Sequence, residues 1–176
     1  MTTTINASTS SGLVVTPDNS GNVLLQYNGQ SAPAFRARPA TSSQSVSNNT
    51  WTKVTLGTED FDTNNNFANS TFTPTVAGYY QVNGSVYCTN SSGNMTQGRC
   101  NIYKNGSAEV WGGFVLTNAT GSNNSDTIGT VSGIVYMNGT TDYLELYGYI
   151  GGSSTGPVFA GSSNYTVFSG CLLRGV

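Results

Sequence analysis

Histidine is absent from this chain, and charged residues are scarce. Six lysines and arginines and eight aspartates and glutamates make up 8% of 176 residues, against about 25% in an average globular protein. General acid–base catalysis needs paired titratable groups, and this inventory offers few. The formal net charge of −2, without a basic cluster, gives no means of neutralising phosphates or an anionic membrane. We therefore expect no enzyme, and neither nucleic acid nor membrane as a partner.

Long apolar runs and helical periodicity are also missing. No segment approaches the roughly 18 apolar residues of a membrane span, and residues 1–20 lack the basic and apolar regions of a secretory signal. No window shows the apolar recurrence that an amphipathic helix needs. The chain is instead rich in glycine (22), tyrosine (10) and phenylalanine (7), together with serine, threonine and asparagine. This composition predicts an all-β protein with many turns. The missing secretory signal predicts that the protein is made in the cytoplasm and is not exported by that route.

Cysteine is too sparse and too widely spaced for a disulfide framework or a metal site. There are three cysteines: Cys88, Cys100 and Cys171. If residues 80–89 and 98–104 form a hairpin, Cys88 and Cys100 face each other across its strands, and a disulfide is compatible with that register. Free buried thiols are the favoured state in a cytosolic product.

The chain divides into an N-terminal arm, residues 1–32, and a body, residues 33–176. Two short apolar pieces in the arm flank the turn-prone residues 17–21 (PDNSG), and a two-stranded hairpin of this size is marginal alone in water. The arm must therefore lie against its own body, a neighbouring subunit or a larger assembly. Its candidate attachment residues are Leu13, Val14, Val15, Val23, Leu24 and Leu25.

The body shows short strands separated by turn signals, as in a β-sandwich. Asn105-Gly106 and Asn138-Gly139 both suit tight hairpins, since asparagine and glycine tolerate positive φ. Within residues 78–89, Tyr80, Val82, Val86 and Cys88 share one parity and are predicted to face the core, opposite Tyr79, Gln81, Asn83, Ser85 and Tyr87. The predicted strands are residues 35–39, 51–56, 71–73, 78–89, 98–104, 107–111, 127–137, 142–150 and 164–173.

Four sequence stretches resemble the C1q-like domain, the trimeric jelly roll of complement C1q heads and, more distantly, of tumour necrosis factor ligands. Phe72, Pro74 and residues 77–82 (AGYYQV) resemble its central signature, and residues 168–173 (FSGCLL) resemble its closing strand, with Cys171 where a second phenylalanine is usual. Two further stretches occur in the order that the family shows. Residues 51–54 (WTKV) with 61–62 resemble its early strands and the loop after them, and residues 142–146 (DYLEL) resemble its penultimate strand. The resemblance covers residues 33–173 and lacks the collagen repeat that precedes the domain elsewhere.

The resemblance implies a C1q/TNF-like jelly-roll β-sandwich that forms a homotrimer about a threefold axis. Outward tyrosines Tyr79 and Tyr87, with Tyr147 and Tyr149 by the parity of their strand, are the candidates for lining that interface, with ordinary sandwich core as the alternative. The arm is similar to N-terminal segments of virion proteins from tailed phages. This second similarity implies a virion structural protein.

Glu59, Asp60 and Asp62 form the only acidic cluster, and residues 60–66 (DFDTNNN) place oxygen atoms at alternate positions. Asp60 and Asp62 are weak candidates for binding a cation, with a solvated turn as the favoured interpretation, and the pattern does not match an EF-hand. The glycine-rich residues 147–157 lack the Lys-Ser/Thr of a phosphate loop and are predicted to be a flexible loop at one end of the sandwich. We expect no cofactor.

Three functions remain. The first is a capsid cement or decoration protein on the exterior of a phage particle, whose arm binds the major capsid protein and whose trimer multiplies weak contacts. The second is a receptor-binding module of a tail or head fibre, in which residues 91–98 or 151–161 recognise a host-surface glycan. The third, a secreted C1q-like lectin, is disfavoured by the missing signal peptide and stalk. Cement is favoured over receptor binding, because the nominated loops are nearly devoid of the tryptophan and tyrosine on which sugars stack.

Overall fold

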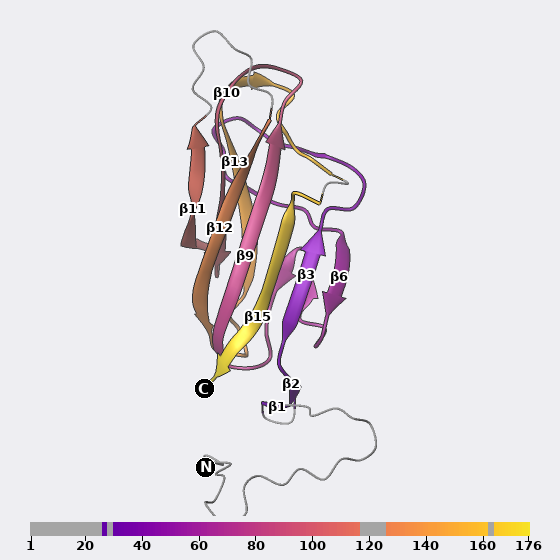
Figure 1. The fold of residues 1–176 in the computed structure, drawn as a ribbon, viewed down its shortest axis with the longest axis vertical. Helices are drawn as coiled ribbons and strands as arrows, with labels where there is room; N and C mark the ends of the chain where they lie inside the picture. The colour runs from indigo at the N-terminus through magenta and orange to yellow at the C-terminus, as the bar shows by residue number, and fades with distance from the viewer. Residues whose placement is uncertain (1–25, 28–29, 117–125, 162–163) are drawn as a thin grey trace, which may run out of the picture.

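The computed structural model describes residues 26–27, 30–116, 126–161 and 164–176, and it contains only strands and turns there. Five strands form the front sheet, which faces the viewer in Figure 1. Its long central strand β9 pairs antiparallel with β12 on one side and β15 on the other. In spatial order the front sheet consists of β6 (Thr58–Asp62), β3 (Ala34–Arg38), β15 (Val167–Gly175), β9 (Gly78–Thr89) and β12 (Asp126–Met137).

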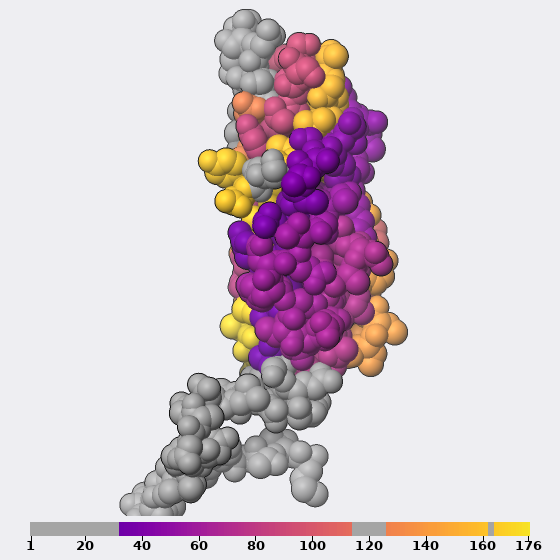
Figure 2. Space-filling view, turned by 90° about the vertical axis from the view of Figure 1, so that its right-hand side faces the viewer, coloured from indigo at the N-terminus to yellow at the C-terminus, as the bar shows by residue number. Residues whose placement is uncertain are grey.

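The back sheet lies behind it and is centred on β13, which pairs with β10 over their whole length. Strand β11 pairs with β10 and, through Gly113 and Thr130, with β12, so it joins the two sheets along one edge. The back sheet consists of β7 (Phe67–Ala68), β8 (Thr71–Phe72), β5 (Thr52–Lys53), β13 (Leu144–Thr155), β10 (Ser92–Lys104) and β11 (Ser107–Leu116). Figure 2 shows the opposite edge, where segments from the first half of the body form most of the surface.

Four short strands complete the architecture. Strand β14 (Val158–Phe159) pairs with both β9 and β4 (Gln44–Ser45). Strands β1 (Gln26–Tyr27) and β2 (Gln30–Ser31) pair with each other and precede β3. In Figure 1 this small hairpin lies at the lower end of the sandwich, near the C-terminus. None of the described segments is a helix long and apolar enough to cross a membrane.

The core lies between the sheets and is built from alternate residues of each strand. Phe35 stacks on Phe72 with ring centroids 4.2 Å apart, and Phe168 meets Phe35 edge-on at 4.9 Å. These contacts join β3 and β15 of the front sheet to β8 of the back sheet. The predicted parity of residues 78–89 is confirmed, because Tyr80, Val82, Val86 and Cys88 are all buried. The predicted all-β sandwich is therefore correct.

One of the two Asn-Gly predictions is right and the other is wrong. Asn105 (φ 52°) and Gly106 (φ 80°) form the tight turn between β10 and β11, where Lys104 pairs with Ser107. Asn138-Gly139 instead connects β12 of the front sheet to β13 of the back sheet, and these strands do not pair. The Asn138 side-chain oxygen accepts hydrogen bonds from the backbone of Thr140, Thr141 and Asp142, which closes this turn without a hairpin.

The hairpin that would place Cys88 opposite Cys100 does not form. Strand β9 belongs to the front sheet and β10 to the back sheet, so the chain crosses the sandwich between them. Both cysteines are buried free thiols, as the sequence favoured, and Cys171 is exposed. Burial raises the pKa of Cys88 and of Cys100 to about 12, which keeps both thiols protonated.

The glycine-rich segments nominated as end loops are largely strand. Ser92 pairs with Thr155 and Gly93 with Ser154, so β10 and β13 continue to the upper end of the sandwich. A register shift between Met95 and Gln97 allows the long pairing. Gly152 lies there at φ 123°, where a Cβ atom would meet the Asn94 carbonyl oxygen at 2.2 Å. Glycine therefore serves close strand pairing here, not loop flexibility.

Candidate functional site

The outer surface of the front sheet carries an exposed apolar cluster at its lower end. Tyr79 on β9 and Tyr136 on β12 are register partners, with ring centroids 5.5 Å apart. Ile134, two residues before Tyr136, is 57% exposed on the same surface. Leu173 and Val176 are exposed at the end of the chain, where Val176 donates a backbone hydrogen bond to Ala77 beside the start of β9. We call these five residues, Tyr79, Ile134, Tyr136, Leu173 and Val176, the front patch.

Above the front patch, the same surface becomes polar. Ser132 donates a hydrogen bond to Asn83 at 2.9 Å, and the Gln81 amide donates to Ser132 at 3.1 Å. Tyr87 lies farther up β9, where its ring meets Tyr165 edge-on at 5.7 Å. Burial is the main cause of a raised Tyr87 pKa, followed by the charge of Asp126. Tyr79 and Tyr87 thus share the front surface but lie at different heights.

Tyr147 and Tyr149 lie on the opposite outer surface, that of the back sheet. Tyr147 has Tyr103 of β10 stacked on it at 3.9 Å, and Tyr149 lies 5.2 Å from Trp51, just before β5. Trp51 also approaches Tyr103 at 6.3 Å. We call the outward surface formed by these four partly exposed rings, Trp51, Tyr103, Tyr147 and Tyr149, the aromatic face. The four predicted interface tyrosines therefore divide between two opposite surfaces.

The sequence could have identified more of the front patch. Ile134 and Tyr136 share the parity of exposed positions in β12, whereas Val131, Val135 and Met137 are buried. That alternation is visible in the sequence. The aromatic face has no such signal, because Trp51, Tyr103 and Tyr147 belong to three separate segments.

Asp60 and Asp62, predicted to lie in a solvated turn, belong to strand β6, and both have partners within the fold. Asp60 forms ion pairs with Arg36 and with Arg38, the latter at 2.8 Å. Asp62 accepts hydrogen bonds from the backbone of Asn64 at 3.3 Å and of Phe67 at 2.7 Å, so it closes the turn before β7. Among the described residues, no group of three or more acidic or sulfur side chains is arranged to hold a metal ion.

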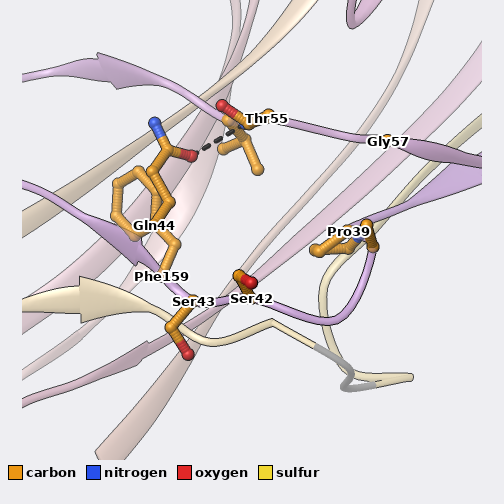
Figure 3. A pocket seen from close by; sticks show the side chains of 9 residues that line it. Pro39, Ser42, Ser43, Gln44, Thr55, Gly57 and Phe159 are labelled. Carbon is orange, nitrogen blue, oxygen red and sulfur yellow. Dashed lines mark hydrogen bonds between the residues drawn. The ribbon is translucent and has the colours of Figure 1, made fainter.

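A small hollow opens beside the loop that follows β3, and Figure 3 shows it from close by. Its volume is about 260 Å³, and buried Phe159 forms part of its wall. The Gln44 side chain accepts a hydrogen bond from the Thr55 amide at 2.8 Å, the dashed line in Figure 3, and donates one to the Lys53 carbonyl, also at 2.8 Å. The hollow is lined by Pro39, Ala40, Ser42, Ser43, Gln44, Val54, Thr55, Gly57 and Phe159. None of these residues carries a titratable side chain.

The six candidate attachment residues of the arm, from Leu13 to Leu25, lie outside the described residues. Their role stays a prediction. The described chain resumes with β1 and β2 and enters β3 at the lower end of the sandwich, the end that also carries the C-terminus and the front patch.

No family model matches this sequence, and no curated protein matches it. Solved structures do match the fold. The globular domain of zebrafish complement 1qA is 19% identical and has a TM-score of 0.50, with 82% of this chain and 99% of that chain covered. Eiger TNF from S. frugiperda is 9% identical, with a TM-score of 0.60 and coverage of 82% and 94%.

Murine APRIL is 10% identical with a TM-score of 0.55, covering 81% of this chain and 99% of that chain. These identities are too low to carry function, but each match covers 81% or 82% of this chain. The structural matches confirm the fold that residues 72–82 and 168–173 indicated. The chain has a C1q/TNF-like jelly-roll fold.

Proposed function

We propose that this protein is a homotrimeric decoration protein on the exterior of a phage capsid, attached through its N-terminal arm. The observation that carries the proposal is the position of the front patch at the end of the sandwich where the arm joins. Exposed aromatic and aliphatic side chains next to one another mark protein–protein interfaces. Three copies packed through this patch about a threefold axis would form a closed assembly.

The position of the chain ends supports the link between trimer and arm. Residues 30–33 lead into β3 at the lower end of the front sheet, close to the C-terminus (Figure 1). A trimer formed through the front patch would therefore bring its three arms together at one end. Three weak arm contacts with the major capsid protein would then act as one attachment of much higher avidity.

The described body also favours a mechanical role over a catalytic one. The hollow beside β3 is lined by neutral side chains, and the side-chain amide of Gln44 is hydrogen-bonded within the fold. Asp60 and Asp62 also have partners within the fold. A cement protein needs no cofactor, because it acts by burying surface across neighbouring capsid subunits. Receptor binding by a fibre module is the alternative function, and the aromatic face favours it.

Attachment to phage particles stripped of this protein tests the proposal. Full-length protein should rebind, while protein lacking residues 1–32 should not, with both forms trimeric by light scattering. A full-length double variant, Leu13→Asp with Leu24→Asp, should lose attachment, and Ser10→Asp in the same arm is the matched control. Failure of the full-length trimer to bind particles, with adhesion to host cells instead, would overturn the capsid role.

A further inference from the structure

The aromatic face is not needed to form the hydrophobic core. Tyr147 and Tyr149 alternate with Leu146 and Ile150, which are fully buried between the sheets. Tyr103 likewise follows buried Ile102 on β10. The aromatic rings therefore lie on the outer side of a sheet whose inner side already carries the core. An aromatic cluster in that position requires its own explanation.

The four rings form one cluster across three segments of chain, in which the Trp51 ring is tilted by 43° to that of Tyr149 and by 52° to that of Tyr103. Trp51 lies between Tyr149, at 5.2 Å, and Tyr103, at 6.3 Å, and Tyr103 stacks on Tyr147 at 3.9 Å. The guanidinium carbon of Arg99 lies 6.0 Å from the centroid of the Tyr149 ring. All four rings are partly exposed. Aromatic faces carry partial negative charge, which attracts the polarised C–H groups on the flat side of a hexose ring.

Hydrogen-bonding groups border the aromatic face. Lys53 forms an ion pair with Glu145 at 2.7 Å and also donates to the Thr71 hydroxyl at 2.7 Å. At the other edge, the Tyr149 hydroxyl donates to the Asn49 side-chain oxygen at 3.3 Å. The Asn49 amide also accepts from the Gly152 N–H and donates to the Gly152 carbonyl, so its second N–H is the group that a ligand would use. Carboxylate, ammonium and amide groups at a ring edge suit the hydroxyl groups of a sugar. Lys53 and Glu145 neutralise each other, so this part of the border carries no net charge and suits a neutral ligand, while Arg99 adds one positive charge beside Tyr149.

The two outer surfaces differ in a way that distinguishes their partners. The front patch includes the aliphatic side chains Ile134, Leu173 and Val176, which are suited to packing against protein. On β13 and β10 the outward positions around the aromatic face hold rings and polar groups but no aliphatic side chain: Glu145, Tyr147 and Tyr149 on β13, and Arg99, Tyr103 and the buried Asn101 on β10. Rings without aliphatic anchors favour a sugar over a second protein chain.

We propose that the aromatic face is a binding site for neutral oligosaccharides, in which hexose rings stack on Trp51 and Tyr149 while Lys53, Glu145 and Asn49 bind their hydroxyl groups. The site lies on the outer side of the sandwich opposite the front patch, so trimerisation through the front patch leaves it open. Three copies would give multivalent binding to a polysaccharide or glycosylated surface. The proposal depends neither on the trimer nor on attachment to a capsid.

The two tryptophans of the chain allow a direct test. Trp51 belongs to the aromatic face, and Trp111 on β11 is 69% exposed and lies opposite Asn101 on the same side of the back sheet. Trp111→Phe keeps an aromatic ring at that position and leaves Trp51 as the only tryptophan reporter. Full-length Trp111→Phe protein is screened on an array of immobilised neutral and sialylated oligosaccharides, and the best-retained neutral glycan is titrated. We expect a saturable change in Trp51 emission that follows binding.

Substitutions then locate the site. Trp51→Ala and Tyr149→Ala should each weaken binding by at least about tenfold, the loss of one stacking contact. Tyr79→Ala, on the opposite surface, is the matched control and should bind as before. If Trp51→Ala does not fold, Tyr149→Ala and the titration of Trp51 emission still show whether the glycan binds at the aromatic face. Retention of no neutral glycan, retention of sialylated glycans alone, or binding unaltered by Tyr149→Ala would overturn the proposal.

Discussion

Tyr79 and Tyr136 lie directly opposite each other on neighbouring strands, with ring centroids 5.5 Å apart and with 45% and 42% of their surfaces exposed. A pair of large rings held side by side and still exposed is costly to leave in water. Beside it, Ile134 is 57% exposed. The pair and its neighbour define the surface on which the proposed trimer depends.

Ile134→Asp should convert the proposed trimer to monomer without unfolding the sandwich. The substitution places an unpaired charge in the front patch, which is unfavourable once the patch is covered and harmless when it is exposed to water. Light scattering coupled to size-exclusion chromatography measures the mass, and circular dichroism checks the fold. Thr96→Asp, an exposed position on β10 in the back sheet, is the control and should stay trimeric. A trimeric Ile134→Asp protein would show that subunits associate elsewhere.

Phe72→Ala should lower the free energy of unfolding by about 3–5 kcal/mol, the usual cost of removing a buried phenylalanine ring. Phe72 is fully buried and contacts both Phe35, at 4.2 Å, and Tyr80, at 5.6 Å, so its loss leaves a cavity between the sheets. Urea denaturation at a fixed protein concentration measures the change. Phe61→Ala removes the same ring from a site that is 48% exposed, and its effect should be much smaller. Equal effects would contradict the assigned core.

Asp142 should make the fold sensitive to acid. The Asn105 amide donates to this carboxylate at 2.8 Å and Lys104 pairs with it at 3.0 Å, and together with the Asn138 amide they lower the pKa of Asp142 below its usual value of 3.8. A carboxylate whose pKa is lower in the folded than in the unfolded state stabilises the fold above the unfolded value. This contribution is lost as the pH falls through the folded value.

The difference in unfolding free energy between wild-type protein and Asp142→Asn should therefore be largest near neutral pH and shrink below about pH 4. Urea denaturation between about pH 7 and pH 3 measures it. Glu109→Gln changes an exposed carboxylate on β11 and serves as the control. A difference that stays constant across this range would mean that the charge of Asp142 does not stabilise the turn.

Of the three thiols, Cys171 alone should react with a thiol reagent in native Ile134→Asp protein, in which the proposed trimer interface is disrupted. Cys88 and Cys100 are buried, and burial raises the pKa of each to about 12, so neither presents the reactive thiolate. Mass spectrometry after labelling should show one modification in native protein and three in urea. Rapid labelling of Cys88 in the native state would contradict its position in the core. Loss of free thiols without reductant would instead reveal a disulfide.

The sequence by itself determined most of the long strands and the side of residues 78–89 that faces inward, but not strand β6 or the glycine-rich ends of β10 and β13. Alternation along residues 78–89 and the Asn105-Gly106 turn are local properties, because side-chain direction in a strand and positive φ in a turn depend on neighbouring residues only. Residues 168–173, which resemble a family signature, also form the closing strand. The exposed side of β12, with Ile134 and Tyr136, follows from the same alternation.

Only the tertiary structure decided which strands pair and which surfaces result. The sequence Asn138-Gly139 is compatible both with a hairpin and with a connection from one sheet to the other. Which of the two forms depends on strand pairing, and strand pairing depends on contacts between residues distant in sequence. The same reason separates Cys88 from Cys100 by sheet and divides Tyr79 and Tyr87 from Tyr147 and Tyr149. Pairing between segments distant in sequence also brings Trp51, Tyr103 and Tyr149 together. Their segments lie in the back sheet with one side facing the core, so the three rings lie near one another on its outer surface.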